Sequence, residues 1–70
     1  MRKFYEIIGL GNVNGEDLRE DIINYVTVGD DGTQRNKYVI LLNPIELATM
    51  KMRLLSFNLR NDTRIGLIPA

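Results

Sequence analysis

The clearest pattern of apolar and polar positions along the chain runs over residues 43–60. Asn43 suits the N-cap of a helix, because its side-chain oxygen accepts a hydrogen bond from an amide of the first turn. Pro44 fits the first helical position, where no amide hydrogen is needed, and Glu46 stands where its carboxylate reaches back to the cap amide. The pattern predicts one main helix.

Apolar residues of this helix fall on two sides, at about 100° of rotation per residue. One side carries Ile45, Ala48, Met52, Leu55 and Leu59. The other side carries Leu47, Met50, Leu54 and Phe57. Such a helix is either covered on both sides by its own domain or offers one side to a partner. Both alternatives stay open, because a short chain has little other structure to cover two sides.

Shorter stretches of β-branched and aromatic residues predict strands before the helix. Residues 3–10 form the first, with Phe4, Glu6 and Ile8 on one face. Residues 22–28 and 37–42 flank a polar loop that contains an Asp-Gly turn signal, so they predict a hairpin. After the helix, residues 61–70 are either an edge strand or a mobile tail.

An acidic segment lies between the first strand and the hairpin. It carries Glu16, Asp17, Glu20 and Asp21. Residues 16–24 predict a short helix with Asn14 as its cap, and the alternative is one longer helix over residues 16–27. The predicted fold class is α+β: a single small domain over residues 1–70 in which a small antiparallel sheet (strand, short helix, hairpin) packs on the main helix.

The amino-acid composition excludes most kinds of catalytic residue. The 70 residues include no Cys and no His, so thiolate nucleophiles, the commonest general base and the commonest metal ligands are missing. The glycines of residues 9–15 do not have the spacing of a dinucleotide-binding loop, and no phosphate-loop lysine follows. We therefore expect no enzyme activity, no catalytic residue, no metal and no cofactor.

The formal net charge of zero hides an asymmetry between the two halves of the chain. Residues 1–34 carry three basic and seven acidic residues, a net charge of −4, whereas residues 35–70 carry six basic and two acidic residues, a net charge of +4. The two halves either attract each other within the fold or present a two-signed surface that orients a charged partner.

Over its whole length the chain resembles small phage-encoded regulators that bind host bacterial RNA polymerase. The resemblance is carried by the strand MRKFYEII, the turn GLGNVNG and the acidic segment EDLRED rather than by a single motif. It implies binding to bacterial RNA polymerase and modulation of transcription, and it assigns no individual residue.

A protein-binding regulator is therefore the function that the sequence predicts. The candidate partner-binding residues come from the charges and apolar faces alone: Arg2, Lys3, Met50, Arg53, Phe57 and Arg60. The alternative is a small nucleic-acid-binding protein that uses the basic C-terminal half. No apolar run reaches the length of a membrane span and the N-terminus does not read as a signal peptide, so we expect a cytoplasmic protein without membrane contact. The oligomeric state stays open.

Overall fold

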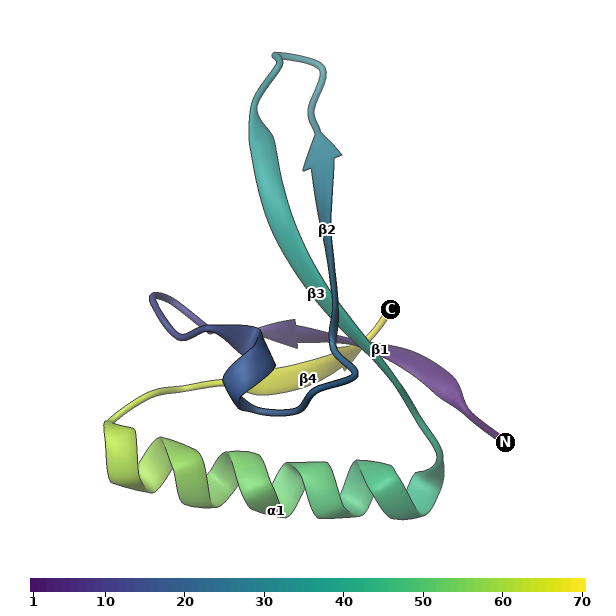
Figure 1. Ribbon diagram of the computed structural model, residues 1–70, viewed down its shortest axis with the longest axis vertical. Coiled ribbons are helices and arrows are strands. Elements are labelled where there is room, and N and C mark those ends of the chain that lie inside the picture. The colour runs from purple at the N-terminus through teal and green to yellow at the C-terminus, as the bar shows by residue number, and fades with distance from the viewer.

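The computed structural model describes all residues from 1 to 70 as a four-stranded antiparallel sheet with one long helix. Its elements are β1 (Lys3–Ile8), η1 (Gly15–Asp17), β2 (Ile23–Val28), β3 (Gln34–Leu42), α1 (Pro44–Asn61) and β4 (Gly66–Pro69). Figure 1 shows α1 along one side of the sheet and the β2–β3 hairpin projecting away from the helix. The predicted α+β class, an antiparallel sheet on one main helix, is confirmed.

The strands lie in the order β2-β3-β1-β4. β1 pairs with β3 on one side, with Tyr5 opposite Ile40, and with β4 on the other. Each crossover skips one strand, which is the arrangement of two interleaved split β-α-β units. Here the first crossover carries only the short 3-10 turn η1, and the second carries α1.

The predicted helix over residues 16–24 is wrong beyond its first turn, and so is the longer alternative over residues 16–27. Only Gly15–Asp17 is helical, capped by the Asn14 side chain, and β2 begins at Ile23. A helix through residue 24 would take Ile23 and Asn24 out of the ladder with β3. The β-branched and aromatic residues of β2 favour the sheet once β3 offers a partner strand.

The core consists of eight buried side chains between the sheet, α1 and the loop before β2. They are Ile7, Leu18, Ile22, Ile40, Leu42, Met50, Leu54 and Ile65. The loop contributes because Gly15 lets the chain pass over the Tyr38 ring, where a Cβ would stand 2.8 Å from Cδ1. A core of this size covers one side of α1 and one face of the sheet.

Two local devices fix the ends of the strands. Gly9 has a φ of +76°, and a Cβ there would lie 2.3 Å from the carbonyl oxygen of Arg64, so only glycine fits. In the hairpin turn, the Asp31 carboxylate accepts hydrogen bonds from the hydroxyl (2.7 Å) and the amide (3.1 Å) of Thr33. These bonds hold the pKa of Asp31 below its ordinary value, the hydroxyl having the larger effect.

Candidate protein-binding surface

The orientation of α1 is set at its first turn by a complete capping box. The Asn43 side chain accepts from the Glu46 amide at 2.7 Å, and the Glu46 carboxylate accepts from the Asn43 amide at 3.0 Å. Pro44 occupies the first helical position. The helix thus begins where the sequence predicts it, because the signal is satisfied within four residues.

The C-terminal end of α1 is held by Asn58. Its amide group donates to the carbonyl oxygen of Ile65 at 2.9 Å, and its side-chain oxygen accepts from the Ile65 amide and the Thr63 hydroxyl. Asp62 caps the helix in the left-handed conformation, with a φ of 52°. This clamp ties the end of the helix to the start of β4 and fixes which side of α1 faces the sheet.

The two apolar sides of α1 have different surroundings. Met50 and Leu54 are buried, and Leu47 and Phe57 pack beside them against the core. The opposite side, which we name the outer row, consists of Ile45, Ala48, Met52, Leu55 and Leu59. Its four large side chains are 63–79% exposed. The domain therefore covers one side of its main helix and leaves the other to solvent.

The outer row has the spacing of a helix-pairing seam. Its members follow one another at intervals of three, four, three and four residues, which keeps them in line along the whole helix. Isolated exposed apolar residues are normal on protein surfaces, but a continuous apolar row marks an interaction site. The outer row can bury an apolar surface of a partner.

Three cations border the outer row. Lys51 lies on one edge and Arg53 and Arg60 lie on the other, and no Asp or Glu occurs between Leu47 and Asn61. None of the three forms an ion pair. Arg53 donates to the carbonyl oxygen of Leu18 at 3.2 Å, and Arg60 donates to the Ser56 hydroxyl. A partner with acidic groups beside an apolar surface fits this arrangement.

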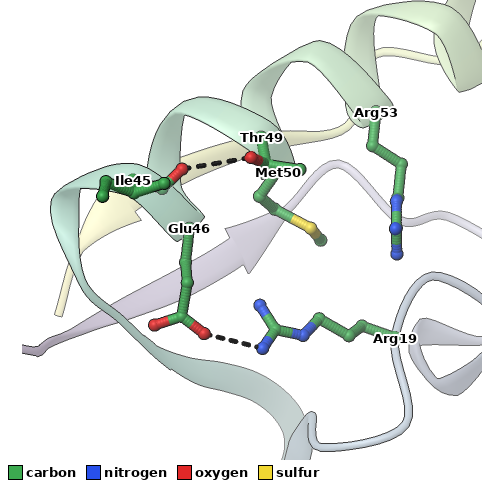
Figure 2. Close-up of a pocket in the computed structure, with 6 residues that line it drawn as sticks. All are labelled: Arg19, Ile45, Glu46, Thr49, Met50 and Arg53. Atoms are coloured by element: carbon green, nitrogen blue, oxygen red, sulfur yellow. Dashed lines mark hydrogen bonds and ion pairs between the residues drawn. The ribbon is translucent and has the colours of Figure 1, made fainter.

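A shallow cavity of about 230 Å³ lies between the first turns of α1 and the loop before β2. Figure 2 shows Arg19 reaching into it from the loop while Arg53 points towards the same space from the helix. Arg19 forms ion pairs with Glu46 at 3.0 Å and with Asp21 at 2.8 Å. The ion pairs of Arg19 hold the loop against the helix at this cavity, and Arg53 is the lining cation that forms no ion pair.

Glu46 is the electrostatic centre of this region. Hydrogen bonding from the Asn43 amide is the main cause that holds its pKa below the ordinary value, and the Arg19 hydrogen bond and the charges of Arg2 and Arg19 act in the same direction. Arg2 lies 3.4 Å from the Glu46 carboxylate. One carboxylate thus joins the cap, the loop and the N-terminus.

The six predicted partner-binding residues do not form one patch. Arg2 lies at the N-terminal end of α1 beside Glu46, and Lys3 is exposed in β1. Arg53 and Arg60 share one edge of α1, separated by two turns or about 10 Å. Arg60 is therefore remote from Arg2 and Lys3, whereas Arg53 lines the same cavity as Glu46, the ion-pair partner of Arg2.

The two predicted apolar contacts lie on the covered side of the helix. Met50 is 2% exposed and Phe57 packs against the core, so Met50 has no surface to offer a partner in this structure. The exposed apolar residues are instead those of the outer row. The regular spacing of that row was the sequence signal that could have directed the choice to it.

No family model, curated protein or solved structure matches this chain. Its one long helix is not apolar enough over its length to cross a membrane. No group of three or more acidic side chains is arranged as a metal site would be.

Proposed function

We propose that the protein is a non-enzymatic cytoplasmic regulator that binds another protein through the outer row of α1 and the cations beside it. The observation that carries the proposal is the exposure of this row in a chain with few buried residues. Ile45, Met52 and Leu59 are each at least 73% exposed. Burying them in a partner supplies the apolar gain, and Lys51, Arg53 and Arg60 supply orientation.

The chemistry of the surface defines the partner as an apolar groove with an acidic rim. The resemblance of the sequence to phage regulators makes bacterial RNA polymerase the partner that we propose, with transcription as the process modulated. Because the rim contacts are electrostatic, association should weaken and slow as the salt concentration rises.

The test compares immobilised wild-type protein with two charge-reversed variants in binding purified bacterial RNA polymerase. Arg53→Glu/Arg60→Glu reverses the charge of the two arginines at the edge of the outer row. Arg35→Glu/Arg64→Glu makes the same change in net charge at exposed positions outside α1. We expect the first variant to lose at least about tenfold in affinity and the second to lose little.

Equal binding by wild type and Arg53→Glu/Arg60→Glu would remove this edge from the interface. A third variant, Leu59→Glu, changes the apolar row itself at a position that is 79% exposed, so its fold should be unaffected. Circular dichroism of each variant separates loss of binding from loss of structure.

The alternative of nucleic-acid binding is supported by the unpaired cations of the C-terminal half. Lys51, Arg53, Arg60 and Arg64 form no ion pair and could contact phosphates. A labelled single-stranded oligonucleotide titrated at several salt concentrations tests this function. A steep fall of the binding constant with salt would favour it, and no binding at low salt would exclude it.

A further inference from the structure

The sheet has a second face, turned away from α1, that is also apolar. We name it the open face. It consists of Phe4, Glu6 and Ile8 of β1, Ile23, Tyr25 and Thr27 of β2, Arg35, Lys37, Val39 and Leu41 of β3, and Ile68 of β4. The register places these residues in rows across the strands, such as Ile23, Val39, Glu6 and Ile68. They alternate with the residues that point to the core.

Seven of the eleven open-face residues are apolar, and five of these are 40–50% exposed. The face of an antiparallel sheet that stays in water normally carries polar side chains, alternating with the apolar ones that face the core. This sheet has apolar residues on both faces, although only one face is covered by α1. The open face thus has the composition of a covered surface.

The middle of the open face holds one ion pair. Lys37 Nζ lies 3.8 Å from Glu6 Oε1, and the side chains are 39% and 25% exposed. A surface that covers this face must accept both charges, because burying a carboxylate or an ammonium group without a counter-charge is costly. The occupant therefore needs one acid and one base opposite this pair, surrounded by apolar residues.

A second copy of this chain meets that requirement. We propose that the open faces of two copies pack against each other about a two-fold axis that passes between Glu6 and Lys37. An interface about such a two-fold axis is self-complementary, because the same surface of each copy meets the other. Each Glu6 carboxylate then faces the Lys37 ammonium group of the other copy. The four charges then form an alternating ring, and the apolar residues around it pack as in a β-sandwich, with the sheets about 10 Å apart.

Two further properties agree with a second copy as the occupant. The formal net charge of zero gives no overall repulsion between copies. β1, β2 and β3, each about 20 Å long or longer, and the shorter β4 lie about 4.8 Å apart and offer a footprint of roughly 400 Å² per copy before side-chain relief is added. That size lies at the weak end of specific interfaces, so we expect dissociation in the micromolar range.

A nucleic acid fits the same face poorly. Stacking platforms for bases are built from aromatic rings within a positive groove. The two rings of this face, Phe4 and Tyr25, belong to strands that β3 separates, and the Lys37 charge is paired with Glu6. In the proposed dimer the outer row of each copy lies on the outside, because α1 covers the opposite side of the sheet. One dimer would then offer two separate partner-binding helices.

Sedimentation equilibrium of the full chain from about 5 to about 500 μM tests the proposal, since mass action makes dimer content depend on concentration. Ile23→Glu should weaken self-association at least tenfold, because it buries an unpaired charge. Val28→Glu is the matched control. It changes an equally β-branched and 66% exposed residue of the same strand that lies on the other face, and it should have little effect.

Charge complementation gives the sharper test. Glu6→Lys alone and Lys37→Glu alone should each remain monomeric, because each brings four like charges together. An equimolar mixture of the two variants should restore the dimer, and rescue also shows that both variants are folded. A monomeric wild type at 500 μM would overturn the proposal, as would failure of the mixture to associate. Binding of a single-stranded oligonucleotide that Ile23→Glu abolishes would assign the face to nucleic acid instead.

Discussion

Glu46 illustrates how much a single residue can fix in a small domain. Its two carboxylate oxygens accept from the Asn43 amide and from the Arg19 guanidinium group, at 3.0 Å each. The contact with the Asn43 amide is part of the capping box at the start of α1. The contact with Arg19 holds the loop whose Leu18 packs in the core. Local helix geometry and tertiary packing therefore depend on the same ionised group.

A pH dependence follows from the lowered pKa of Glu46. A carboxyl group whose pKa is lower in the folded state stabilises the fold above its unfolded pKa, and that stabilisation is lost as the pH falls through the folded pKa. Glu46→Gln should therefore be less stable than wild type at pH 7, and the difference should shrink below the ordinary value of 4.5. Urea denaturation at several pH values measures it.

Glu20→Gln is the control for this measurement, since Glu20 forms no ion pair. Because it removes a carboxylate without a partner, it should change the free energy of unfolding at pH 7 by no more than about 0.5 kcal/mol. A Glu46→Gln difference that stays constant down to about pH 3 would contradict the assigned role of the carboxylate.

At the scale of the element, the two apolar sides of α1 have different roles: one packs in the core and the other is exposed. The Met50 and Leu54 side closes the core, and the outer row remains exposed. Hydrophobicity alone does not separate the sides, since both carry leucine and methionine. The difference is set by the capping box and by the Asn58 clamp, which fix the rotation of the helix over the sheet.

Adjacent leucines of α1 allow a direct comparison of the two sides. Leu54 is 3% exposed and Leu55 is 63% exposed. Leu54→Ala should lower the free energy of unfolding by about 2–5 kcal/mol, because it leaves a cavity in the core. Leu55→Ala should change it by no more than about 0.5 kcal/mol, since leucine and alanine have similar helix propensities.

Chemical denaturation of both variants measures the difference. Comparable losses for the two would mean that the outer row is covered in solution. In that case self-association through α1 would be the first explanation to examine, by repeating the denaturation at several protein concentrations.

At the scale of the whole molecule, the last strand completes the sheet. β4 pairs with β1 from Tyr5 to Ile8, and Leu67 packs against the core. Residues 66–69 are thus an edge strand, one of the two alternatives that the sequence left open. The molecule measures 37 × 32 × 18 Å, so it has a single thin core with two large exposed faces.

Removal of residues 66–70 should destabilise the domain by at least about 2 kcal/mol, since it uncovers apolar surface that Leu67 buries and exposes the edge of β1. Deletion of Ala70 alone removes one backbone hydrogen bond, to Phe4 at 3.2 Å, and should cost much less. Amide hydrogen exchange locates the effect. Unchanged protection of the β1 amides in the shorter chain would contradict the structural role of β4.

Features whose signals are satisfied within a few residues could be predicted from the sequence alone. The start of α1 at Pro44 follows from Asn43 and Glu46, and the hairpin turn follows from Asp31 and Gly32. The β-branched strands follow from local propensity. The α+β class results from these elements taken together, which is why it was predictable without the tertiary structure.

Which surfaces are covered could not be predicted, because it depends on contacts between distant parts of the chain. Residues 16–24 carry the local signals of a helix start, a cap at Asn14 and acidic residues in the first turn, but pairing with β3 draws Ile23 and Asn24 into a strand. Met50 and Leu55 have similar hydrophobicity, but the rotation of α1 buries the first and exposes the second. The physical reason is that burial depends on partners distant in sequence, and this chain has enough apolar structure to cover only one side of α1 and one face of its sheet.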